Sequence, residues 1–313
     1  MGRPLRFLPR PQTTFEVTTR CVQARLLLRP SARLNELVLG VLGRALSRWP
    51  EVKLHLVVVA ANHMHLLVTV SDSGSLSAFM CFVNSNIARE AGRLYGWREK
   101  FWSHRYHAIA VLDERALMER ARYLLSHGCK EDLVERPGDW PGVQCAEALT
   151  EGRKLTGVWY DRTGECRARG GRKKDGAESF TVRYEVPLAP LPFWSGLSEA
   201  EQRRRAAELL EEIEREHRER RERTGKKGVV GRQRVLEQNP HSIPGEVKRT
   251  RAPSCHSSEP GLREGYRQSY RAFVEAYRRA AAELREKRRL VDFPDHSFPP
   301  APGYWTSGAA AGG

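Results

Sequence analysis

The segment ANHMHLLVTV, residues 61–70, places two histidines on either side of a methionine inside an otherwise apolar run. A run of this length and composition is typical of a buried β-strand. Residues two apart on a strand point to the same side, so His63 and His65 share one face and Met64 and Leu66 share the other. We assign the Met64 face to the helix-covered core, which leaves the two imidazoles together on the opposite face.

The segments around this strand predict further strands and helices. We expect strands at residues 14–23, 53–60, 63–70 and 101–112, and helices at residues 31–49 after a Ser cap, 76–96 ending at Gly96, and 113–128 between Asp113 and Gly128. The order β, α, β, β, α, β, α is that of a split β-α-β, ferredoxin-like domain with an added helix. The predicted fold class is therefore α+β: an antiparallel sheet with helices on one face, plus a basic, mainly helical C-terminal extension.

The texture of the chain changes after residue 150, where RTGECRARGGRKKDGAES (162–179) is Gly-rich, basic and poor in apolar residues. We therefore divide the chain into a flexible basic lead-in at 1–12, the ferredoxin-like domain at 13–150, a linker or mobile segment at 151–185, the basic helical extension at 186–300 and a disordered tail at 301–313.

Two long helices are expected in the extension. Residues 198–227 alternate acidic and basic side chains and have a thin apolar stripe, which favours a solvated helix. Residues 262–289 carry an aromatic stripe that either packs on a core or stacks bases. Their opposite face carries basic side chains that can follow a phosphate backbone, namely Arg267, Arg271, Arg278 and Arg279.

The composition favours a polyanionic partner. Lys plus Arg exceed Asp plus Glu by 53 to 38, which gives a formal net charge of +15, and nucleic acid is the obvious polyanion. A merely basic soluble surface is the alternative. The six cysteines form no CxxC pair, and neither a signal-peptide core nor a transmembrane run is present. We expect a cytoplasmic protein with reduced thiols and no membrane partner.

The two histidines indicate a divalent metal site. Their β-carbons are expected about 6.5 to 7 Å apart on one strand face, where two imidazoles can converge on one cation. The alternative is a pair of structural histidines, hydrogen-bonded on the surface of the sheet.

The third predicted helix adds polar groups to this region. Arg120, Tyr123 and His127 fall at i, i+3 and i+7 on one face, with Arg115 on its flank and Glu119 offsetting part of the positive charge. A nucleophilic tyrosine needs an accessible oxygen and nearby positive charge that favours the phenolate. A surface tyrosine on an ordinary amphipathic helix is the alternative.

Three motifs in this order carry a resemblance: NHMHLLV (62–68), YLLSH (123–127) and LVERPGDWPG (133–142). They resemble the HUH (His, hydrophobe, His) single-strand endonucleases with one catalytic tyrosine, and most of all the REP-associated tyrosine transposases and their insertion-sequence relatives. The likeness covers roughly the first 145 residues. It implies that His63 and His65 bind Mg²⁺ or Mn²⁺, with His127 as third ligand, and that Tyr123 attacks the scissile phosphate.

The resemblance implies a transposase that cleaves and rejoins single-stranded or hairpin DNA through a 5′-phosphotyrosine, in the bacterial cytoplasm and nucleoid-associated when bound to DNA. Dimers occur among the insertion-sequence relatives and monomers among the REP-associated ones, so a homodimer is one option. The expected DNA contacts are Arg20, Arg98, Lys100, Arg105, Arg115 and Arg120, with Trp97 or Trp102 as a base-stacking surface.

The chain departs from the family pattern at three places. His127 stands where the family usually has Asn or Gln, which shifts the metal preference from Mg²⁺ toward Mn²⁺ or a later transition metal. HG replaces a frequent NP, and Glu16 replaces a frequent histidine of the first strand. A catalytically inactive DNA-binding regulator is therefore the alternative function. A replication initiator or relaxase fits less well, because Tyr123 lies downstream on a helix.

Overall fold

The computed structural model describes residues 5–170, 180–226, 228–245, 252–287 and 291–298. Its main sheet has the strand order β2-β3-β1-β4-β7, and all neighbours are antiparallel except β4 and β7. The strands are β1 (Thr13–Arg20), β2 (Lys53–Val59), β3 (His63–Val70), β4 (His107–Val111) and β7 (Cys255–His256). The order β2-β3-β1-β4 is that of a ferredoxin-like sheet, so the predicted α+β fold class is confirmed.

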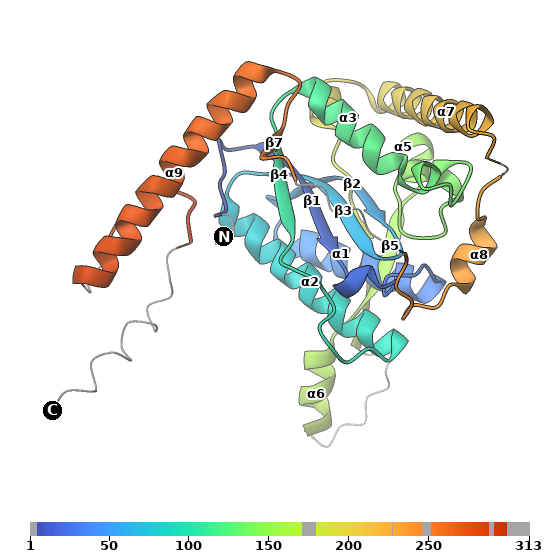
Figure 1. The fold of residues 1–313 in the computed structure, drawn as a ribbon. Helices are drawn as coiled ribbons and strands as arrows, with labels where there is room; N and C mark the ends of the chain where they lie inside the picture. The colour runs from blue at the N-terminus through green and yellow to red at the C-terminus, as the bar shows by residue number, and fades with distance from the viewer. Residues whose placement is uncertain (1–4, 171–179, 227, 246–251, 288–290, 299–313) are drawn as a thin grey trace.

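Helices α1 (Ala32–Arg48) and α2 (Ser73–Tyr95) pack against each other on one face of the sheet (Figure 1). That face carries the alternate residues of β1 and β3 that are almost fully buried, including Val17 and its partner Leu66. Ser31 caps α1 by accepting a hydrogen bond from the Leu34 amide at 3.1 Å, and Gly96 ends α2 in the left-handed region at φ +66°. The predicted helix-covered core is confirmed.

Helix α3 (Glu114–Leu125) lies over the opposite face of the sheet, so helices flank both faces (Figure 1). The α+β class holds, but the expectation of helices on one face only is wrong. Asp113 caps α3 by accepting from the Ala116 amide at 2.8 Å. The predicted end at Gly128 is wrong: α3 ends at Leu125, and the short helix α4 (His127–Lys130) runs through Gly128. A β-carbon at Gly128 would lie 2.8 Å from Val134 Cγ2, so close packing accounts for this glycine.

Part of the expected linker is folded. Strands β5 (Leu155–Tyr160) and β6 (Thr181–Val186) form an antiparallel pair that packs along α1, and α6 (Arg162–Gly170) lies between them in the chain. The linker prediction is wrong for these ranges. It rested on the composition of the Gly-rich basic stretch between the two strands, and the strands themselves are short and rich in β-branched and aromatic residues. Residues 171–179 lie outside the described part of the chain.

The C-terminal extension is mainly helical, as predicted. It contains α7 (Glu199–Arg223), α8 (Arg232–Glu237) and α9 (Pro260–Lys287), preceded by α5 (Ala146–Glu151), and the described short 3-10 helices are η1 (Val22–Ala24), η2 (Pro137–Asp139) and η4 (Pro192–Trp194). Helix α7 is not wholly solvated, because Leu209 and Ile213 are buried. Lys226 beyond its end forms an ion pair with Asp132 at 2.6 Å.

The described part of the N-terminal lead-in packs against α9. The Phe7 ring centroid lies 5.1 to 5.7 Å from those of Tyr266, Tyr270 and Phe273, and Leu8 is buried. The prediction of a flexible lead-in is therefore wrong for residues 5–12, and the first aromatic residues of α9 form a packing face. The predicted tail at 301–313 lies outside the described residues.

None of the helices in the described ranges combines the length and the apolar character that crossing a membrane requires.

The contact between α1 and β5 predicts a large effect of one methyl group. A β-carbon at Gly40 would lie 2.1 Å from the Val158 carbonyl oxygen, so β5 must move to admit it. We expect Gly40→Ala to lower the free energy of unfolding by about 2 kcal/mol or more, although alanine normally stabilises a helix.

Gly265→Ala is the matched control, because Gly265 lies in α9 and a β-carbon there would have nothing within 4 Å. We expect it to be neutral or to stabilise by up to about 1 kcal/mol. Urea denaturation of both variants measures the difference. Equal effects at the two positions would contradict direct packing of β5 on α1.

Candidate metal and nucleophile site

Three histidines converge over the face of the sheet that α3 covers. His63 and His65 come from β3 and His127 from α4, and their ligand nitrogens all lie within 4.8 Å of one another. The Nε2 atoms of His63 and His127 are 2.7 Å apart. The predicted pair on one strand face is present, and the turn between α3 and α4 brings the third imidazole to it.

The neighbour Asn62 fixes the tautomer of His63. The Asn62 side-chain amide donates to the Ala24 carbonyl at 3.1 Å, so its oxygen is left to accept from His63 Nδ1 at 2.5 Å. With the proton on Nδ1, Nε2 of His63 presents a lone pair toward His127. That is the arrangement in which imidazole binds a metal ion.

His65 is oriented in a similar way by two residues of β1. Its Nδ1 lies 3.2 Å from Glu16 Oε1 and 3.0 Å from Thr18 Oγ1. A carboxylate can only accept, so Nδ1 carries the proton and Nε2 is left as the ligand atom. Carboxylate–histidine pairs of this kind orient metal-binding imidazoles and raise their basicity.

Burial keeps two of the imidazoles neutral. It lowers the pKa of His63 well below its usual value and the pKa of His127 to about 3, with the neighbouring His65 and Arg20 adding to the effect on both. Metal binding requires neutral imidazole, so these histidines are in the binding form at neutral pH.

The donor set fits a divalent metal ion. Three imidazoles can occupy one face of a coordination sphere and leave other positions open for a substrate oxygen, as catalytic sites require. Imidazole nitrogen suits Mn²⁺, Zn²⁺ and other transition metals better than Mg²⁺, which prefers oxygen.

Tyr123 from α3 lies beside the three histidines. Its ring centroid is 5.8 Å from that of His65 and 6.4 Å from that of His127. Two cations flank the ring: the Arg120 guanidinium carbon is 5.0 Å and the Lys130 ammonium 4.4 Å from its centroid. The structure thus brings the predicted Tyr123 and Arg120 to the histidines and adds Lys130, which the sequence analysis missed although it lies seven residues after the tyrosine.

The expectation that the surroundings favour the phenolate is wrong for the protein alone. Burial and the nearby Glu16 carboxylate raise the pKa of Tyr123, and Arg120 offsets them only in part. Tyr123 is therefore a neutral phenol at neutral pH, and its activation needs additional positive charge.

Glu16 is the centre of the charged groups behind the histidines. It is 5% exposed, and its Oε2 lies 3.0 Å from His256 Nε2 and 3.8 Å from Arg120 Nη1. Burial raises the pKa of Glu16, but its interactions with His256 and His65 outweigh this and lower it to about 2. Glu16 is therefore ionised and holds positive or donor groups from β3, α3 and β7.

His256 reaches Glu16 because the C-terminal chain returns to the sheet. Strand β7 pairs with β4, and the Leu112 amide donates to the His256 carbonyl at 2.9 Å. Asp113 accepts from the Ser258 amide at 2.8 Å and from its hydroxyl at 2.9 Å. The sequence analysis considered Glu16 only as a departure from the family and gave His256 no role, since no local pattern joins residues 240 positions apart.

The other predicted DNA contacts lie on β1, on α3 and in the segment between α2 and β4. Arg20, at the end of β1, lies opposite His63 in the pairing of β1 with β3. Arg115 is 80% exposed on α3 and lies 3.7 Å from Glu119. The segment between α2 and β4 exposes Arg98, Lys100 and Arg105.

The two tryptophans of that segment are held by the protein. Trp102 donates to the Asn84 carbonyl at 2.8 Å. Trp97 donates to the Lys100 carbonyl at 3.2 Å, and Arg25 lies over its ring at 5.1 Å. Trp97 and Arg98 also line a hollow of about 510 Å³ at the end of α2, away from the histidine face.

Residues 34–125 match the family model described as "Transposase IS200 like". The matched segment runs from α1 to the end of α3, so it includes His63, His65 and Tyr123 and stops before His127. The resemblance drawn from the motifs is confirmed for this segment, which is similar to IS200-like transposases. None of the curated proteins compared with the chain matches it.

Two solved structures are similar to parts of the chain. One is a REP-associated tyrosine transposase bound to a REP hairpin, at 16% identity and TM-score 0.41, covering 48% of this chain and 86% of that one. The other is a putative transposase from Deinococcus radiodurans R1, at 12% identity and TM-score 0.28, covering 39% of this chain and 95% of that one. The fold class of the present chain rests on its own strand order.

The geometry predicts that the three histidines bind Mn²⁺ jointly. We expect His65→Ala to weaken binding by at least about 100-fold, and Glu16→Gln, which keeps all three imidazoles but loses the carboxylate that orients His65, by about 10-fold to 100-fold. Isothermal titration with Mn²⁺ measures both, with His104→Ala, an exposed histidine, as control. Equal affinities in all four proteins would contradict a site at these residues.

The lowered pKa of His127 predicts the direction of a pH effect. Between pH 6.5 and about 3 the unfolded chain binds a proton at this residue and the folded protein does not, so stability falls as pH falls. The contribution is up to about 1.4 kcal/mol per pH unit.

Urea denaturation of metal-free protein at pH 7, 6, 5 and 4 tests this effect. We expect His127→Asn to have a shallower loss of stability toward low pH than the wild type, and His104→Asn to leave the slope unchanged. A wild-type slope in His127→Asn would show that His127 titrates normally in the folded protein.

Proposed function

We propose that this protein is a metal-dependent transposase that cleaves and rejoins single-stranded DNA through a 5′-phosphotyrosine at Tyr123. The observation that carries the proposal is the convergence of three imidazoles with Tyr123, within or directly after a segment that matches IS200-like transposases. Few other reactions need a cation site and a tyrosine in contact.

The chemistry assigns a task to each residue. The Tyr123 oxygen attacks the scissile phosphorus, the bond to the 3′ oxygen breaks, and the proton balance closes because the phenol loses a proton while the departing 3′ oxygen gains one. The phosphotyrosine conserves the energy of the bond, so a 3′-hydroxyl can reverse the step and rejoin strands. Arg120 and Lys130 offset negative charge beside the ring.

His63, His65 and His127 hold the metal ion in this proposal, and Asn62 and Glu16 orient two of these ligands. A divalent cation held there would supply positive charge that favours the phenolate and offsets the charge of the scissile phosphate. We assign Mn²⁺ ahead of Mg²⁺, because all three donors are imidazoles. The raised pKa of Tyr123 in the protein alone makes this charge a requirement for attack.

We propose single-stranded or hairpin DNA as the partner, supported by the net charge of +15. One structurally similar protein is bound to a REP hairpin, and for this chain we propose hairpin-forming repeat ends as the substrate. The backbone contacts are Arg20 and Arg120 at the site, with Arg98, Lys100, Arg105 and Arg115 farther out. The proposal places the protein in the cytoplasm, with access to DNA, and uses histidines and a tyrosine from a single chain.

A second candidate is a DNA-binding regulator without catalytic activity. The raised pKa of Tyr123 and the direct 2.7 Å contact between His63 and His127 favour it, because both describe a site that is satisfied without substrate. Such a protein would bind the same DNA and form no covalent adduct.

Tyr123→Phe separates the two candidates. We expect wild-type protein with Mn²⁺ and labelled single-stranded hairpin DNA from the ends flanking its gene to give a slow-migrating adduct on a denaturing gel. The Phe variant is expected to lose it, by at least about 100-fold, because it lacks the attacking oxygen.

Tyr184→Phe is the matched control, because Tyr184 lies on β6, away from the site, and its hydroxyl accepts from the Arg44 guanidinium at 2.8 Å. It is expected to form the adduct as the wild type does. A retarded complex on a native gel, with no adduct in the wild type under Mn²⁺ or Mg²⁺, would establish the regulator instead.

A further inference from the structure

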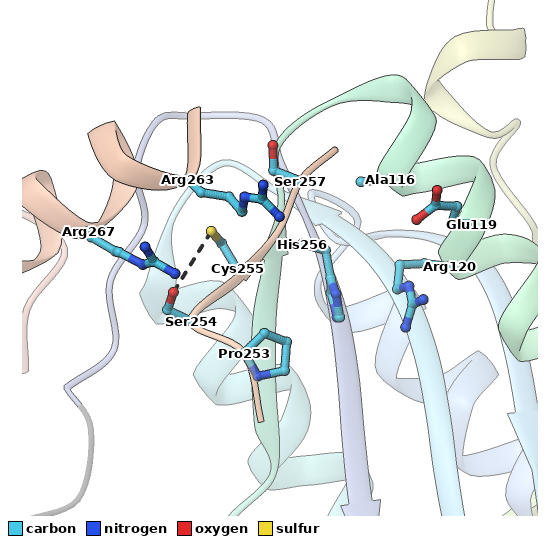
Figure 2. Close-up of a pocket in the computed structure, with 10 residues that line it drawn as sticks. All are labelled: Ala116, Glu119, Arg120, Pro253, Ser254, Cys255, His256, Ser257, Arg263 and Arg267. Carbon is cyan, nitrogen blue, oxygen red and sulfur yellow. Dashed lines mark hydrogen bonds between the residues drawn. The ribbon is translucent and has the colours of Figure 1, made fainter. Parts of the chain in front are cut away.

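A second polar pocket adjoins the histidine site. It has a volume of about 300 Å³ and lies between α3, the segment 253–257 and the first turns of α9. Its lining residues, drawn in Figure 2, are Ala116, Glu119, Arg120, Pro253, Ser254, Cys255, His256, Ser257, Arg263 and Arg267. The proposed cleavage chemistry uses only Arg120 of these.

The charges in the pocket favour an anion. Three guanidinium groups line the pocket, from Arg120, Arg263 and Arg267, together with a single carboxylate, that of Glu119. Glu119 lies 3.7 Å from Arg115, outside the pocket, and Arg267 lies 3.7 Å from Glu264. Among the described residues no carboxylate is within ion-pair distance of Arg263, so this charge is left for a ligand.

The arginines come from two sides of the pocket, which suits an anionic ligand held between α3 and α9. Figure 2 shows Arg120 from α3 on one side of His256, and Arg263 from α9 on the other. Arg267 projects from the next turn of α9 toward Ser254. Guanidinium groups and serine hydroxyls are the donors that bind phosphate oxygens.

A single side chain, Glu16, contacts both the lining of the pocket and the proposed metal ligand His65. His256 and Arg120 both line the pocket, and both contact Glu16 Oε2, at 3.0 and 3.8 Å. The other oxygen of Glu16 lies 3.2 Å from His65. A phosphate in the pocket and a phosphate at the histidines are therefore close enough to belong to one strand.

We propose that this pocket binds a backbone phosphate of the single-stranded DNA, close to the phosphate that Tyr123 attacks. This inference rests on the proposed function and adds a site to it. Arg263 and Arg267 are the principal ligands, and the anchoring of Ser258 by Asp113 fixes the segment that carries them relative to α3. The C-terminal extension thereby sets where the strand lies relative to the tyrosine.

The test pairs a double variant with single neutral phosphates in the DNA. Each phosphate of the hairpin oligonucleotide is replaced in turn by an uncharged methylphosphonate, and the dissociation constant is measured by fluorescence anisotropy. In the wild type we expect one replaced position near the cleavage point to weaken binding by about 10-fold. In Arg263→Ala/Arg267→Ala the same replacement is expected to have no further effect, because the partner charge is already gone.

Arg215→Ala/Arg218→Ala is the matched control, since it removes two exposed charges from another helix of the extension, α7, outside the pocket. It is expected to keep the full response to the methylphosphonate. The pocket variant is also expected to lower the salt dependence of binding by about two ion equivalents. Circular dichroism and thermal denaturation verify that all variants fold.

The outcomes separate this inference from the proposed function. Equal methylphosphonate responses in the wild type and the pocket variant would overturn the phosphate site, while the Tyr123 adduct, measured separately, would leave the transposase proposal standing. A position-specific loss of response without any adduct would support the pocket in a protein that binds DNA but does not cut it. No binding by the wild type would overturn both.

Discussion

The buried carboxylate of Glu16 joins four segments of this chain. It lies on β1, contacts His65 on β3, Arg120 on α3 and His256 on β7, and is 5% exposed. Removing one partner from a buried network of charges typically costs about 3 to 5 kcal/mol, because the other charge is left unpaired. The relative positions of the His65 imidazole, the helix that carries Tyr123 and the returning C-terminal chain therefore depend on one side chain.

Desolvation has opposite consequences for the two kinds of functional group at the site. It lowers the pKa of His63 and His127 and so keeps these imidazoles neutral, and it raises the pKa of Tyr123 and so keeps the phenol protonated. A bound cation reverses only the second effect, since its charge stabilises a phenolate. Under the proposed function, Tyr123 would therefore become reactive only when the three histidines hold a cation.

The C-terminal extension does more than cover the surface of the domain, because it contributes residues next to the histidines. It supplies His256, closes one wall of the arginine-lined pocket and provides the aromatic face on which Phe7 packs. Near the two ends of the described chain, the Arg6 guanidinium lies over the Phe298 ring at 4.5 Å. A ferredoxin-like sheet leaves the outer edge of β4 open, and pairing with β7 satisfies part of that edge.

The sequence by itself determined the α+β class and the two strand faces of HMHLLVTV, because period-two alternation and helical spacing are local properties. The choice of His63, His65, Tyr123 and His127 as one set came from the resemblance of three motifs to the HUH endonucleases. The sequence also indicated the caps at Ser31, Asp113 and Gly96, which depend on a few adjacent residues. The end of α3 was misplaced, because the packing of Gly128 against Val134 is not a local signal.

Only the tertiary structure decided the rest. Three features join residues that are far apart in the chain: the pairing of β5 with β6, the packing of Phe7 on α9, and the contact of Glu16 with His256. The protonation states of the site were equally inaccessible, since they depend on how deeply each group is buried and on which charges face it. Local sequence patterns indicate which chemical groups are present at the site. Long-range packing determines which groups surround them, and the surroundings determine their protonation.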